Sequence, residues 1–123
     1  MIFIRDNIIK SKFPKNVELS KIIKPLLPDG SYLSKKIPVF LEYENSSRGM
    51  TFGVAKYLYK CNQDKIKCRV VFIESLKHNI QHEKDTQYAK NIVKMAKSKY
   101  VSFDFYIVKD ESELDSILKK ILN

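Results

Sequence analysis

The segment PDGSYLSKKIPVFLEYE, residues 28–44, determines most of what the sequence predicts about the fold. Residues 31–34 and 37–44 are short and rich in β-forming side chains, and two lysines separate them, so the spacing predicts a β-hairpin. The second stretch is apolar until it ends abruptly in Glu42-Tyr43-Glu44. Such an ending is typical either of a strand that leaves the core or of a functional site at the end of a strand.

The residues around this hairpin predict helices that alternate with strands. Asn16 is a favourable N-cap for a helix over residues 17–27, and Pro25 either kinks or ends its last turn. Residues 76–85 are polar and favour a loop or an exposed first turn. After the hairpin we predict, in chain order, a helix over 50–60, a strand over 68–75, a helix over 86–99, a strand over 100–108 and a helix over 111–122.

The order of these elements predicts an α/β fold, a three-layer sandwich in which helices flank a central mixed β-sheet. The hairpin strands are antiparallel, whereas strands that are joined through a helix are parallel to their neighbours. Residues 68–75 form a continuous apolar run, which is typical of a central strand covered on both faces. A chain of 123 residues is long enough for one core and too short for two, so we predict a single domain over residues 1–123.

The chain is strongly basic, and its lysines occur in every segment. Lysine and arginine number 23 against 14 acidic residues, which gives a formal net charge of +9. This charge suits a polyanionic partner such as nucleic acid. The alternative is a genome that enriches lysine, asparagine and isoleucine together, because all three are abundant here. The net charge alone therefore favours nucleic acid only weakly.

The cysteines and the apolar runs predict an intracellular protein with free thiols and no membrane contact. Cys61 and Cys68 lie seven residues apart without a CxxC pattern, and charged residues interrupt the apolar N-terminus before a signal peptide could form. No apolar run approaches the roughly 20 residues of a membrane-spanning helix. His78 and His82 could bind zinc on one face of a helix, but their polar surroundings favour solvated histidines.

The acidic residues of the hairpin form the candidate site. Alternate side chains of a strand share a face, so Glu42 and Glu44 point the same way, with Cα atoms roughly 6.5 to 7 Å apart. At that separation two carboxylates can share or flank one divalent cation. The hairpin also returns Asp29 toward the strand that carries Glu42. Three carboxylates at one sheet edge cost stability unless a cation neutralises them.

These residues resemble the motif of the PD-(D/E)XK nuclease superfamily, and the resemblance extends over residues 16–75. Pro28-Asp29 corresponds to the "PD", and Glu42-Tyr43-Glu44 corresponds to the "(D/E)X" and the position after it. The resemblance implies a restriction-endonuclease-like fold and one or two Mg²⁺ ions, with Mn²⁺ as a substitute. The implied metal ligands are Asp29, Glu42, Glu44 and the backbone carbonyl of Tyr43.

The third motif position departs from the family pattern, because it holds Glu44 where lysine is usual. Some members carry acid there, and others carry the lysine on the following helix, where the segment GVAKYLY places Lys56. Lys56 is therefore the implied catalytic cation, and the alternative is a lysine on a solvated helix face. Arg48 and Lys60 flank the same helix and are candidates for phosphate contacts with DNA. By the same resemblance, Glu18 of the first predicted helix could lie near the site.

The resulting hypothesis is a metal-dependent DNA endonuclease that acts as a homodimer, since one domain presents one site and duplex cleavage needs two. One alternative is a catalytically inactive module that keeps the nuclease fold and binds nucleic acid or a protein partner. Another is an unrelated α/β binding domain, in which Asp29 and Glu42 would lie far apart. Tyr57, Tyr59 and Tyr88 could stack on unpaired bases, although aromatic residues at helical spacing more often belong to the core.

Overall fold

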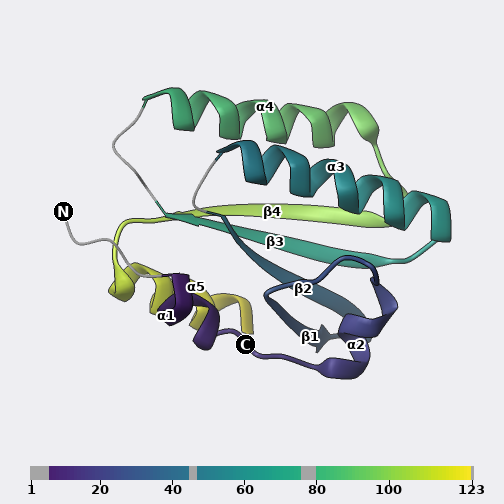
Figure 1. The fold of residues 1–123 in the computed structure, drawn as a ribbon, viewed down its shortest axis with the longest axis horizontal. Coiled ribbons are helices and arrows are strands. Elements are labelled where there is room, and N and C mark those ends of the chain that lie inside the picture. The colour runs from purple at the N-terminus through teal and green to yellow at the C-terminus, as the bar shows by residue number, and fades with distance from the viewer. Residues whose placement is uncertain (1–5, 45–46, 76–79, 123) are drawn as a thin grey trace.

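The computed structural model describes residues 6–44, 47–75 and 80–122, without the side chains of residues 6, 47, 48 and 80–85. Five helices and four strands alternate along these ranges (Figure 1). In chain order they are α1 (Asp6–Ser11), α2 (Val17–Ile22), β1 (Gly30–Ser34), β2 (Ile37–Glu44), α3 (Ser47–Asp64), β3 (Cys68–Ser75), α4 (Ile80–Ala96), β4 (Val101–Val108) and α5 (Glu111–Leu122).

The four strands form one open, mixed sheet in the order β1-β2-β3-β4. β1 pairs with β2 in antiparallel register, with Gly30 opposite Leu41, which confirms the predicted hairpin. β2, β3 and β4 are parallel to one another, and the connections between them run through α3 and α4. The predicted α/β class with a mixed sheet is therefore confirmed.

Helices cover both faces of the sheet (Figure 1). α3 and α4 pack on one face, where the core includes Phe40 of β2, Phe72 of β3 and Val54 of α3. α1 and α5 pack on the opposite face, where the core includes Leu41 of β2 and Leu114 of α5. β3 contributes buried residues to both cores, as expected for the continuous apolar run at 68–75.

Three helices differ from the sequence prediction. α1 was not predicted, because a six-residue helix shows no apolar period; it is held by tertiary packing, in which Ile9 is fully buried. α2 ends at Ile22 instead of residue 27, with Ile23 as its C-cap just before Pro25. α4 begins at Ile80 instead of residue 86, since a polar stretch can extend a helix whose later turns are packed.

The two cysteines lie in contact, which their sequence positions did not indicate. Cys61 near the end of α3 and Cys68 at the start of β3 are both buried free thiols, and their Sγ atoms are 3.5 Å apart. The hydrogen bond between them, together with burial, raises the pKa of the Cys68 thiol. The predicted free thiols are confirmed, and both belong to the core between α3 and the sheet.

Gly53 allows α3 to lie close to the sheet. A Cβ atom at this position would come within 2.9 Å of Cε1 of Phe72. The Phe72 ring cannot easily move, because it stacks on Phe103 and Phe105 with ring centroids 6.1 and 5.7 Å away. Gly53 lowers the helix propensity of this segment, but the close packing of α3 on the sheet requires it.

We predict that Gly53→Ala destabilises the protein by about 1 to 3 kcal/mol, although alanine in a helix is favoured over glycine by about 1 kcal/mol. The steric contact with Phe72 outweighs the helix propensity. Urea denaturation measures the effect. The matched control is Ala55→Gly at an exposed position of the same helix, which should cost about 1 kcal/mol. A Gly53→Ala protein as stable as wild type would contradict this explanation.

Candidate functional site

A pocket of about 220 Å³ lies between the end of β2 and the first half of α3. Polar groups enter it from both elements. Glu42 and Glu44 come from β2, and Lys56 and Tyr57 come from α3. The remaining wall is formed by Leu26, Leu27, Gly49, Phe52 and Gly53.

The strand pairing explains why both glutamates face this pocket. Glu42 lies opposite Phe72 of β3, and Glu44 lies opposite Glu74, so both point to the face covered by α3 and α4. Phe40, two residues before Glu42 on this face, is fully buried, whereas Glu42 and Glu44 are half-buried. The carboxylates therefore occupy the boundary between the core and solvent, as the strand period predicts.

Glu42 is the most perturbed carboxyl group of the pocket. The pKa of Glu42 is raised from 4.5 to about 8, chiefly by burial and to a smaller extent by the negative charges of Asp29 and Glu44. Two interactions oppose this shift: a hydrogen bond that the Tyr57 hydroxyl donates to Oε1 (2.7 Å), and the positive charge of Lys10. At neutral pH Glu42 therefore holds a proton most of the time.

Asp29 lies beside the pocket, one residue before the start of β1. Its Oδ2 accepts a hydrogen bond from the backbone N–H of Tyr43 (2.9 Å), and its Oδ1 is 3.4 Å from Nζ of Lys10 on α1. The hairpin thus brings Asp29 next to Glu42, and its charge acts on the Glu42 carboxyl. The arrangement in which these two residues lie far apart is not observed.

Lys56 lies on α3 one residue before Tyr57 and lines the same pocket as the two glutamates. Its Nζ is 5.6 Å from the centroid of the Phe52 ring, a cation–π contact on the exposed side of the helix. Of the four predicted catalytic residues, Glu42, Glu44 and Lys56 line one pocket and Asp29 contacts the backbone next to it. The Tyr43 side chain points to the opposite face and donates a hydrogen bond to Ser75.

The other predicted residues do not join this pocket. Lys60 forms an ion pair with Asp64 further along α3, and the carboxylate of Glu18 is 81% exposed and pairs with Lys21. The side chains of Arg48 and His82 and all of His78 lie outside the described residues. Base stacking by Tyr57 is excluded, because its ring is only 2% exposed.

Sequence reasoning missed two polar residues near the pocket. Tyr57 was considered for base stacking or for the core, and its hydrogen bond to Glu42 was not predicted. Glu74 of β3 is fully buried, lies opposite Glu44 and accepts a hydrogen bond from Thr86 of α4 (2.8 Å). A signal existed for Glu74, since it ends the apolar run of β3 in the same way that Glu42 and Glu44 end β2.

The carboxylate oxygens of this pocket are of the kind that Mg²⁺ prefers, since proteins usually hold it through one or two carboxylates while it keeps several waters. Glu42 and Glu44 in one pocket, with the charge of Asp29 nearby, fit such an open site. They do not form a closed metal cage. Within residues 6–44, 47–75 and 80–122 there is no group of three or more histidine, cysteine or acidic side chains placed to hold a metal ion.

Comparisons with protein-family models, curated proteins and solved structures gave no match to this chain. In the part of the chain that the structure describes, no helix is both long and apolar enough to cross a membrane. The function is therefore inferred from the pocket and from the residues around it.

The raised pKa of Glu42 predicts that the protein without divalent cations loses stability as the pH rises. The unfolded chain releases this proton near pH 4.5, whereas the folded chain keeps it to about pH 8. Between these values the folded state binds more protons, so the free energy of unfolding falls with increasing pH. Glu42→Gln cannot titrate, and we expect its stability to fall less over this range.

Urea denaturation at several pH values between 5 and 8.5, with EDTA present, tests this prediction. Glu18→Gln is the matched control, because Glu18 is exposed, does not line the pocket and is not among the charges that act on Glu42. It should keep the wild-type pH dependence. Identical pH dependence in wild type and Glu42→Gln would show that Glu42 ionises normally.

Proposed function

We propose that this protein is a metal-dependent endonuclease that hydrolyses phosphodiester bonds in DNA and belongs to the PD-(D/E)XK superfamily. One observation carries the proposal: two glutamates from β2 and one lysine from α3 line a single pocket, with Asp29 bonded to the strand beside it. Acidic groups together with a nearby cation are what the cleavage of a phosphodiester requires.

The topology supports the same proposal. After the antiparallel hairpin of β1 and β2, the chain passes through α3 into β3, which is parallel to β2. The acidic residues lie just before β1 and at the end of β2. This order agrees with the restriction-endonuclease-like core that the motif resemblance implies. Lys56 lies on the helix directly after β2, where the superfamily can carry its lysine when the usual position holds another residue.

The proposed metal ligands are Asp29, Glu42, Glu44 and the backbone carbonyl of Tyr43. When bound there, Mg²⁺ or Mn²⁺ would supply Lewis-acid stabilisation of the phosphate charge and lower the pKa of a bound water. Glu42 must first release its proton, and the Tyr57 hydroxyl favours this release because its hydrogen bond lowers the pKa of Glu42. The Tyr43 amide and Lys10 orient Asp29.

Lys56 provides the positive charge that the superfamily usually places at the motif position occupied here by Glu44. Its flexible side chain starts from the pocket wall and ends in an ammonium group, which can bind a phosphate oxygen and offset the charge that develops during cleavage. The net charge of +9 favours binding to the DNA backbone, with Arg48 and Lys60 as further candidates for phosphate contacts. A homodimer would present the two sites that duplex cleavage needs.

A second candidate is an inactive nuclease-fold module that binds nucleic acid or a protein. It is favoured by the existing contacts of the carboxylates: Asp29 is bonded to the Tyr43 amide, and Glu42 is bonded to Tyr57 and protonated at neutral pH. Metal-dependent nicking of supercoiled plasmid separates the two candidates. Nicking by the wild-type protein supports the nuclease, and its absence with both Mg²⁺ and Mn²⁺ supports the module.

We predict that Glu42→Gln and Asp29→Asn each reduce plasmid nicking at least about a hundredfold, because each removes a negatively charged metal ligand. Both variants should remain folded, since they keep the shape of the side chain and relieve repulsion between carboxylates. Glu18→Gln should nick like wild type. Wild-type activity in either pocket variant would exclude the proposed carboxylate site.

For Lys56→Met we predict a loss of nicking of roughly a hundredfold or more with Mn²⁺ affinity retained, because the substitution keeps the apolar stem and removes only the charge. Calorimetric titration with Mn²⁺ reports the metal affinity. Lys119→Met, at an exposed position of α5 on the opposite face of the sheet, is the matched control and should keep most of the activity. Equal activity of the two variants would place Lys56 among the solvated surface lysines.

A further inference from the structure

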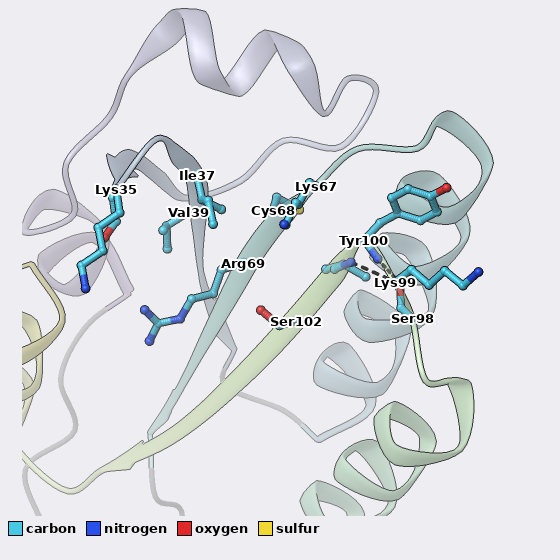
Figure 2. A pocket seen from close by; sticks show the side chains of 12 residues that line it. Lys35, Ile37, Val39, Lys67, Cys68, Arg69, Ser98, Lys99, Tyr100 and Ser102 are labelled. Atoms are coloured by element: carbon cyan, nitrogen blue, oxygen red, sulfur yellow. Dashed lines mark hydrogen bonds between the residues drawn. The ribbon is translucent and has the colours of Figure 1, made fainter.

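A second and larger pocket, of about 370 Å³, lies at the opposite end of the sheet from the carboxylates (Figure 2). β2 begins at this pocket with Ile37 and ends at the acidic site with Glu44. The nearest lining residues of the two pockets on β2 are Val39 and Glu42, which point to opposite faces of the sheet. The two pockets are therefore separate.

The parallel strands explain how this pocket forms. The turn between β1 and β2, the connection from α3 to β3 and the connection from α4 to β4 all meet where the parallel strands begin. Val39, Arg69 and Ser102 are direct partners in the register and form one row across three strands on the face of α1 and α5. Ile37 extends the apolar part of this floor.

The charge of this pocket is positive. Lys35, Lys67, Arg69 and Lys99 line it, and none of its lining residues is acidic. In Figure 2, Lys35 and Arg69 lie on one side of the pocket, and Lys99 lies on the other side with its side chain pointing outward. Asp104 bonds the Nε of Arg69 and so fixes the guanidinium group, which leaves the three lysines as exposed positive charges.

The backbone of the same loops has positive φ angles at lysine residues, of which Lys35 lines the pocket. Among the described residues, positive φ angles outside glycine occur at four positions: Lys35, Lys36, Lys65 and Lys97. All four belong to the three loops at this end of the sheet. Such angles favour glycine or asparagine, and the chain contains seven asparagines, yet lysine occupies each position. The hairpin turn and the two helix ends require these angles, so lysine adds positive charge there at a modest cost in backbone strain.

We infer that this pocket binds the phosphate group of a nucleotide, with the apolar floor at Ile37 and Val39 against the uncharged part. The volume falls in the range of about 300 to 1,000 Å³ that is typical of small-molecule sites. Lysine and arginine provide charge-assisted hydrogen bonds to phosphate oxygens, and the Ser102 hydroxyl lies on the floor between them. The inference does not depend on nuclease activity. The phosphate comes either from a free nucleotide or from the end of a nucleic-acid strand.

NMR titration of ¹⁵N-labelled protein tests the site with inorganic phosphate, AMP, and a tetrathymidylate with or without a 5′-phosphate. We expect saturable shifts of the Lys67, Arg69 and Ser102 amides. Stronger binding of AMP would identify a free nucleotide, and stronger binding of the 5′-phosphorylated strand would identify a strand end. The inference would be overturned if no probe caused a saturable shift. It would also be overturned if the two oligonucleotides bound equally while AMP and inorganic phosphate caused no shift.

Variants separate this site from general attraction of anions to a basic protein. Lys67→Gln/Lys99→Gln should weaken binding of the responsive probe about tenfold or more, because two phosphate contacts are lost. Lys15→Gln/Lys109→Gln removes the same charge from exposed positions outside the pocket and should change affinity less than about twofold. Equal weakening by the two double variants would overturn the inference.

Discussion

The parallel pairing of β2 with β3 is the constraint on which the rest of the structure depends. Parallel neighbours cannot be joined by a tight turn, so α3 must cross over one face of the sheet and return the chain to the other end. This crossover brings Lys56 and Tyr57 next to Glu42. It also collects the loops before β2, β3 and β4 at the opposite end, where positively charged residues line the larger pocket.

Glu42 is the carboxyl group of the pocket that is most costly to ionise. A half-buried carboxyl group beside two other carboxylates is costly to ionise, and its pKa of about 8 expresses that cost. The Tyr57 hydroxyl and Lys10 reduce the cost without removing it. A divalent cation would reduce it further, which is why the electrostatics of this pocket agree with the proposed metal-dependent function. The acidic and the basic pocket lie at opposite ends of one sheet.

The strands were predictable because their signals are local. The apolar run at 68–75 and the hairpin at 31–44 are complete within a few residues, and both are present in the structure. α1 and the start of α4 were not predicted, since the first is a single short helix held by packing and the second begins in a polar stretch. The contact between Cys61 and Cys68 depends on how α3 meets β3, which residue spacing does not express.

For the candidate site, the sequence by itself determined that Glu42 and Glu44 share a face and that Asp29 returns to them, because strand period and hairpin pairing are geometric rules. Only the tertiary structure decided that Tyr57 bonds Glu42, that Lys56 lines the same pocket and that Lys60 does not. It also decided that Glu74 lies opposite Glu44 and that lysines from three loops meet at one end. The physical reason is that these contacts join elements far apart in the chain, and their geometry follows from packing across the sheet.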